Sequence, residues 1–138
     1  MPALPNEVFL SHSHRDLAFV AKLVEVLRRH GIPIWYSERD ILGAQQWHDE
    51  IGQALQRCDW FVLVLSPAAV ESKWVKHELL YALNDPRYED HFVPLIYQPC
   101  DVRRLSWTLP SFQAINFTGG FAESCRLLLR IWGIGYRT

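Results

Sequence analysis

Trp74 and Glu78 lie four residues apart in the segment 72–80, whose apolar spacing is that of an amphipathic helix. Positions i and i+4 are neighbours on a helix surface, so the indole can cover one side of the carboxylate and partly shield it from water. A carboxylate in such surroundings is suited to catalysis. In the simpler interpretation Trp74 is a core residue, and Glu78 is a solvated acid that pairs with Lys73 or Lys76.

Other catalytic patterns are missing from the chain. No glycine-rich turn follows the first predicted strand, and GxxxxGK[ST] and GxSxG do not occur. HExxH is missing too, since Tyr81 stands where its second histidine would be. His12 and His14 form an x-H-x-H pair without a third ligand at helpful spacing, so we expect polar loop residues and no metal site. Trp74 and Glu78 are left as the candidate chemistry.

Composition points to one soluble domain. The chain has 138 residues, of which 49% are hydrophobic, enough for one filled core and too few for two ordinary domains. Its formal charge of -1 gives no bulk attraction to nucleic acid or to an anionic membrane, and no segment has the length of a membrane span. Cys58, Cys100 and Cys125 lack CxxC spacing, which argues against a disulfide framework and a zinc knuckle. We therefore expect a cytoplasmic domain that contacts neither nucleic acid nor membrane.

Short apolar runs alternate with helical periodicity along the chain. The predicted strands are 8–10, 32–36, 60–65, 92–97 and 115–117. Apolar stripes at helical spacing fill 17–27, 47–58, 75–83 and 121–132, with a short helix at 102–105 and with Ser13 or Asp16 as the cap of the first helix. The run 60–65 is apolar on both faces, as a strand covered on each side requires. The sequence thus predicts an α/β, three-layer, flavodoxin-like fold with a five-stranded parallel sheet in the order 2-1-3-4-5.

Ligands of such a sheet bind beyond the carboxyl ends of strands one and three, where the winding of the chain reverses. The loops at this place are 11–15 and 66–71. Response-regulator receivers share the topology, but they need an aspartate at the end of the third strand, where this chain has Ser66. Arg15 and Arg39 lie in loops at the same edge, where either can meet a phosphate group, although exposed and solvated arginines are the simpler interpretation. Trp74 and Glu78 belong to the helix after the third strand, beside this predicted site.

Four stretches together resemble a Toll/interleukin receptor (TIR) domain of the bacterial-type, NAD-cleaving branch. They are Val-Phe-Leu-Ser-His-Ser at 8–13, Glu-Arg-Asp-Ile-Leu-Gly at 38–43 continuing to Trp47, Phe-Val-Leu-Val-Leu-Ser-Pro at 61–67, and the tryptophan-x-x-x-glutamate spacing within 72–78. The resemblance covers about 8–132, and it implies that the chain, 1–138, is a single TIR domain. Members of this branch cleave NAD+ at the nicotinamide glycosidic bond, whereas many animal adaptor TIR domains lack the catalytic glutamate.

The resemblance also implies roles for individual residues. Glu78 matches the catalytic glutamate, Trp74 the aromatic residue that shapes its pocket, and Trp47 an aromatic position near the nicotinamide side. Ser37 stands where an aspartate usually follows the second strand. The substrate-binding residues implied in this way are Phe9, Ser11, His12, Ser13, Ser37, Arg39, Trp47 and Trp74, with NAD+ as the substrate and no cofactor or metal.

The activity implied is that of an NAD+ nucleosidase, which yields nicotinamide and either ADP-ribose or a cyclic ADP-ribose isomer. Such activity serves immune or antiphage signalling in this family and depends on self-association with other TIR domains, and a sensor domain following Thr138 is a further expected partner. The alternative is a non-enzymatic module that signals by homotypic TIR assembly through the loop 37–47 and exposed helix faces. Because a surface carboxylate contributes little to folding, we also expect Glu78→Gln to leave thermal stability almost unchanged.

Overall fold

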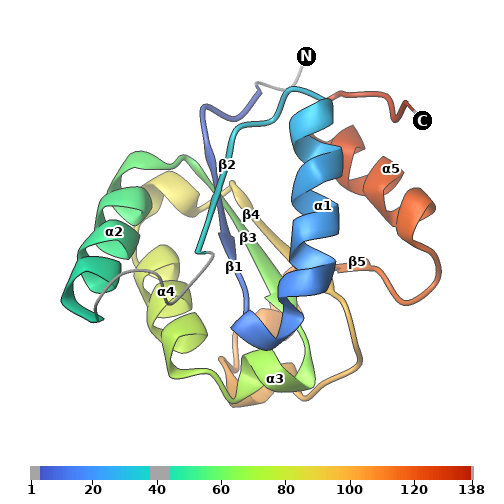
Figure 1. The fold of residues 1–138 in the computed structure, drawn as a ribbon. Helices are drawn as coiled ribbons and strands as arrows, with labels where there is room; N and C mark the ends of the chain where they lie inside the picture. The colour runs from blue at the N-terminus through green and yellow to red at the C-terminus, as the bar shows by residue number, and fades with distance from the viewer. Residues whose placement is uncertain (1–3, 38–43, 138) are drawn as a thin grey trace.

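A computed structural model describes residues 4–37 and 44–137, with side chains from residue 48 onward in the second segment. Five parallel strands form one sheet in the order β2-β1-β3-β4-β5 (Figure 1). The strands are β1 (Val8–Ser11), β2 (Ile34–Tyr36), β3 (Trp60–Leu65), β4 (Phe92–Ile96) and β5 (Ile115–Asn116). The predicted fold class, a five-stranded parallel sheet in the order 2-1-3-4-5 with flanking helices, is confirmed.

Helices cover both faces of the sheet. α1 (Leu17–Arg29) and α5 (Phe121–Ile131) pack on one face, and α2 (Ala44–Arg57) and α4 (Lys73–Leu83) pack on the other (Figure 1). A short helix, α3 (Pro67–Val70), follows β3. The 3-10 helices are η1 (His14–Asp16), η2 (Pro86–Tyr88), η3 (Val102–Arg104) and η4 (Leu109–Ser111). Among the described residues, no helix combines the length and the apolar character that a membrane crossing demands.

The central strand β3 contributes to two apolar clusters, one on each face of the sheet. Val62 and Val64 belong to the cluster with α1 and α5, while Phe61, Leu63 and Leu65 belong to the cluster with α2 and α4. All five side chains are at most 2% exposed, as expected for a strand that is covered on both sides. The sheet is therefore a packed base from which the loops at the carboxyl ends of its strands extend.

Aromatic rings on four neighbouring strands stack in a row on the α2 and α4 face. Trp35 on β2, Phe9 on β1, Phe61 on β3 and Phe92 on β4 have ring centroids 5.0, 5.4 and 5.4 Å apart in that order. The register explains the row, because Phe9 lies opposite Trp35 and Phe61, and Phe61 lies opposite Phe92. Parallel strands about 4.8 Å apart place such side chains next to one another. Phe9 is completely buried in this row.

Two serine caps define where helices begin at the carboxyl edge of the sheet. Ser72 Oγ accepts a hydrogen bond from the backbone N–H of Val75 at 3.2 Å and caps α4. Ser66 Oγ accepts from the backbone N–H of Ala69 at 3.0 Å and caps α3. The sequence analysis did not predict α3, although Ser66 followed by Pro67 is a common helix start. Both caps place the first turns of these helices next to the site.

Candidate active site

A serine stands at the carboxyl end of each of the two central strands. Ser11 is the last residue of β1 and is 1% exposed, and Ser66 directly follows β3 and is completely buried. α4 brings Glu78 to Ser11, and η1 brings Asp16 to Ser66. The predicted switch point between β1 and β3 therefore holds buried polar side chains that are bonded to one another.

Glu78 lies in the second turn of α4 and is only 6% exposed. Ser11 Oγ donates a hydrogen bond of 2.6 Å to Glu78 Oε1. Burial raises the pKa of Glu78 to about 8, and the hydrogen bond from Ser11 opposes this rise only in part. The simpler interpretation of Glu78 as a solvated acid paired with Lys73 or Lys76 is therefore wrong.

A buried carboxyl group of this kind changes its charge when a cation comes near. At neutral pH most of Glu78 carries its proton, because its pKa of about 8 lies above the pH. A positive charge within about 4–6 Å favours the ionised form and lowers the pKa. Glu78 can therefore release its proton when a cationic group binds beside it. The resulting carboxylate then acts in surroundings of low dielectric constant, where it stabilises positive charge strongly.

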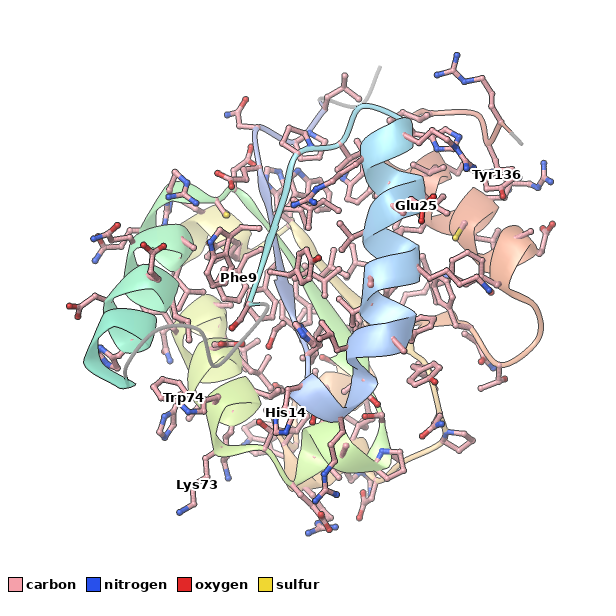
Figure 2. The ribbon with its side chains drawn as sticks, in the orientation of Figure 1. Phe9, His14, Glu25, Lys73, Trp74 and Tyr136 are labelled. Carbon is pink, nitrogen blue, oxygen red and sulfur yellow. The ribbon has the colours of Figure 1, made fainter. Side chains whose placement is uncertain are left out.

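Trp74 occupies the first turn of α4, one helical turn before Glu78. It is half-buried and packs against the apolar cluster between α4 and the sheet. Its ring centroid lies 5.8 Å from that of His48 on α2 and 6.1 Å from that of His77. In Figure 2, Trp74 and the labelled His14 of η1 lie toward the same end of the molecule. Trp74 thus packs on the core with one side and keeps part of its surface exposed one helical turn before Glu78.

The loop between β1 and α1 lines the same edge. Ser13 is 5% exposed, and its Oγ accepts a hydrogen bond from the backbone N–H of Arg15 at 3.3 Å, which caps η1 rather than α1. The ring of half-buried His12 lies 6.1 Å from the ring of Tyr36 at the end of β2. His14 and Arg15 are exposed. The loop therefore buries its serines and presents His14 and Arg15 at the edge of the site.

The remaining residues that the resemblance implies are Ser37, Phe9, Arg39 and Trp47, and they do not form one cluster of described side chains. Ser37 is half-buried and directly follows β2. Phe9 is completely buried in the aromatic row and belongs to the core cluster on the α2 and α4 face, and its contact with substrate stays a prediction. Arg39 lies outside the described residues. Trp47 belongs to α2, but its side chain lies outside the described part of the chain.

A second buried acid, Asp16, lies at the same edge, and the sequence analysis considered it only as a helix cap. Asp16 precedes α1, yet it makes no side-chain hydrogen bond that caps this helix. Its Oδ2 instead accepts a hydrogen bond of 2.5 Å from Ser66 Oγ. Burial raises the pKa of Asp16, and the bond from Ser66 acts against the rise. A serine directly after a buried strand was the available signal, because a buried hydroxyl group needs a hydrogen-bond partner.

The cysteines do not form a competing reactive centre. Cys58 and Cys125 are buried and Cys100 is half-buried. Burial raises the pKa of Cys58 to about 12 and that of Cys125 to about 11, and it also raises the pKa of Cys100. The thiols therefore stay protonated and are poor nucleophiles. Within the described residues, no group of three or more His, Cys, Asp or Glu side chains is placed to hold a metal ion.

Comparison with known proteins gives the family of the chain. The family model for the TIR domain matches residues 8–129. The chain belongs to the TIR domain family. The membership expected from the sequence motifs is thereby confirmed. The TIR domain of the Toll-related receptor TRR-2 from Hydra magnipapillata has the same fold, with a TM-score of 0.73 and 21% identity over 89% of this chain and 94% of that one.

Two microbial relatives of this TIR domain have names that state an activity. NAD(+) hydrolase TcpC of Escherichia coli O6:H1 (strain CFT073) is 30% identical over 90 residues, which cover 64% of this chain and 29% of the relative. The 2' cyclic ADP-D-ribose synthase BtTIR of Bacteroides thetaiotaomicron is 27% identical over 79 residues, which cover 56% of this chain and 28% of the relative. The matched region thus spans less than a third of the length of either relative.

Proposed function

We propose that this TIR domain cleaves the bond between nicotinamide and ribose in NAD+, with Glu78 as the catalytic residue. The observation that carries the proposal is the buried carboxyl group of Glu78, bonded by Ser11 at the carboxyl edge of β1 and β3. Ligands of doubly wound sheets bind at this edge. The names of the two microbial relatives support the same substrate.

Cleavage of this bond requires one negative charge close to the ribose. Nicotinamide is a pyridinium cation in NAD+, so it departs as a neutral molecule and needs no general acid. The ribose develops oxocarbenium character as the glycosidic bond breaks. An ionised Glu78 beneath the sugar stabilises this positive charge or orients the ribose hydroxyl groups. One carboxylate therefore suffices where glycoside hydrolases commonly use two.

The substrate itself supplies the charge that ionises Glu78. Free Glu78 is mostly protonated at neutral pH because its pKa is about 8. The positive pyridinium of NAD+, bound beside it, lowers this pKa and favours loss of the proton. The carboxylate then forms in the complex, where the developing oxocarbenium ion interacts with it most strongly.

The other side chains at this edge bind the remaining parts of NAD+ in the proposed complex. Half-buried Trp74 forms a wall beside the nicotinamide end, and Trp47 is proposed there from its place in the sequence. His12, Ser13 and Ser37 line the nucleotide side. Arg15, which is exposed at the site edge, and Arg39 meet the pyrophosphate, since guanidinium groups form strong charge-assisted hydrogen bonds with phosphate oxygens.

Two products are compatible with this chemistry, depending on what attacks the ribose. Attack by water gives ADP-ribose, and attack by a group of the same molecule gives a cyclic isomer. The two relatives are named for one outcome each, a hydrolase and a cyclic ADP-ribose synthase. Chromatography of the reaction products distinguishes the two, because the cyclic isomer and ADP-ribose differ in retention.

We further propose that the domain acts in immune or antiphage signalling and that self-association activates it. The test measures nicotinamide release from NAD+ at low and high protein concentration, for wild type and for Glu78→Gln. Glu25→Gln is the matched control, since Glu25 is an exposed acid on α1, away from Trp74 and His14 (Figure 2). Release that rises with protein concentration and depends on Glu78 supports the enzyme. Self-association in light scattering without release by wild type would instead establish a non-enzymatic assembly module.

A further inference from the structure

Two serine–carboxyl pairs cross between the central strands. Ser11, at the end of β1, donates a hydrogen bond to Glu78. Glu78 belongs to α4, and this helix follows β3 in the chain. Ser66, at the end of β3, bonds Asp16, which immediately precedes the helix after β1. Each pair therefore ties the end of one central strand to the connection that follows the other.

The loop 12–15 is held between these two pairs. Ser11 precedes the loop and is bonded to Glu78 at 2.6 Å. Asp16 follows the loop and is bonded to Ser66 at 2.5 Å. A segment this short, anchored by a buried hydrogen bond at each end, has few backbone conformations open to it. The positions of its exposed side chains therefore depend on both anchors.

Stability alone does not explain the second anchor. Asp16 is 7% exposed and Ser66 is completely buried, and burying an acid carries a desolvation penalty. A well-packed apolar pair of similar volume is often at least as stabilising as a buried polar one. Asp16 also gives up a side-chain cap on α1 to accept the bond from Ser66. Such an arrangement is expected where the position of a loop matters for function.

We propose that Asp16 and Ser66 are a positioning pair that holds the loop 12–15 against the end of β3 and thereby sets the affinity of the site for NAD+. The inference rests on the proposed cleavage of NAD+ and adds two residues that act without touching the substrate. The pair places exposed His14 and Arg15 at the site edge. Because Glu78 keeps its own bond from Ser11 when the pair is broken, substrate binding is expected to weaken more than the chemical step.

The test compares steady-state kinetics and backbone amide hydrogen exchange for Asp16→Ala, Ser66→Ala and Asp16→Asn. Asparagine keeps an oxygen that accepts from Ser66, so Asp16→Asn retains the link without the acid. Asp101→Ala is the matched control, since Asp101 is exposed and makes no side-chain cap at the start of η3. We expect Asp16→Ala and Ser66→Ala to raise KM for NAD+ about tenfold while kcat changes less than about threefold. Amide exchange should become faster at 12–15 and stay unchanged in α4.

The outcomes separate positioning from a purely structural role. A structural role lowers the melting temperature and the active fraction, which appears as a lower kcat with an unchanged KM, and this result would overturn the inference. Near-wild-type KM in Asp16→Asn together with the increase in Asp16→Ala supports it, even where the alanine variants are less stable. An unchanged KM in the alanine variants, with wild-type cleavage intact, refutes the positioning pair alone. Absence of nicotinamide release by wild type at every concentration refutes the proposed function first.

Discussion

The two ends of β1 and β3 hold acidic residues in different ways. At the amino ends, Glu7 precedes β1 and pairs with Arg57 at 2.6 Å. Asp59 precedes β3 and accepts hydrogen bonds from the backbone N–H groups of Asn6 and Glu7 at 3.0 and 3.1 Å. These acids have positively charged or N–H partners and remain in contact with solvent. These acids therefore act as ion-pair and hydrogen-bond partners that hold the amino edge of the sheet together.

At the carboxyl ends of the same strands the acids are buried and bonded by neutral hydroxyl groups. Ser11 donates a hydrogen bond to Glu78, and Ser66 donates one to Asp16. Burial raises the pKa of both acids. A hydroxyl group compensates the loss of water around a carboxylate far less than a cation does. The acids at the amino ends therefore have a structural role. The acids at the carboxyl ends are buried carboxyl groups, and a cation bound beside them can lower their pKa and ionise them.

The sharpest test of this contrast exchanges one acid at each end for its amide. Glu78→Gln is expected to reduce nicotinamide release by roughly a hundredfold or more, because the amide cannot supply the negative charge that stabilises the oxocarbenium ion. Glu7→Gln is expected to leave the rate within about twofold. Steady-state assays at a protein concentration where wild type is active measure both. Equal losses in the two variants would contradict the division between the ends.

The second test concerns stability and its dependence on pH. The pKa of Glu78 is raised from 4.5 to about 8 on folding, so the folded chain binds this proton more tightly than the unfolded chain does. The stabilisation is fully present below about pH 4.5 and is lost as the pH rises through about 8. The loss is about 5 kcal/mol in the free energy of unfolding, because each pKa unit corresponds to about 1.4 kcal/mol.

Urea unfolding of wild type and Glu78→Gln between pH 5 and 9 measures this loss. The amide does not titrate, so the difference between the two curves isolates Glu78. Glu78→Gln should become increasingly the more stable protein as the pH rises from about 5 to about 8, which replaces the expectation that it leaves stability almost unchanged. A constant difference across the whole range would show that Glu78 is not desolvated in solution.

The fold was predictable because its signals are local and repeated. The apolar run 60–65 has the length and the β-branched and aromatic content of a strand covered on both faces, and the structure places it at the centre of the sheet. Helical stripes between the strands then required parallel pairing with right-handed crossovers. The four-residue helix α3 was missed because it is too short to show a period, and only Ser66 and Pro67 marked its start.

The site was predictable as a location but only partly as a set of contacts. The spacing of Trp74 and Glu78 placed both residues on one helix, yet it carried no information on how deeply Glu78 is buried. The partners Ser11 and Asp16 lie 67 and 50 residues from the groups that they bond, so no local pattern reveals these pairs. Side-chain alternation along a strand likewise does not show which of its two faces lies near a ligand. The burial of Phe9 in the core cluster is visible only in the structure.

A smaller effect is expected when Ser11 is replaced by alanine. The hydrogen bond from Ser11 lowers the pKa of Glu78, so its loss raises this pKa further above its usual range. At neutral pH fewer molecules hold the carboxylate, and we expect kcat/KM to fall about tenfold and its rising limb to move to higher pH. The pH profile of nicotinamide release measures the shift, with Ser111→Ala, at an exposed serine, as the control. A uniform fall in rate without movement of the limb would indicate that Ser11 acts on folding alone.

The smallest effect belongs to the ion pair at the amino end. A double-mutant cycle of Glu7→Gln and Arg57→Ala should give a coupling of less than about 1 kcal/mol in the free energy of unfolding, because the Arg57 side chain is 51% exposed and water screens the pair. The coupling should shrink further in 1 M salt, because the screening length falls to roughly 3 Å, close to the separation of this exposed pair. Denaturation in low and high salt measures both quantities. A coupling of several kcal/mol that salt leaves intact would mean that the amino end also holds its charges away from water, and the distinction between the two ends would fail.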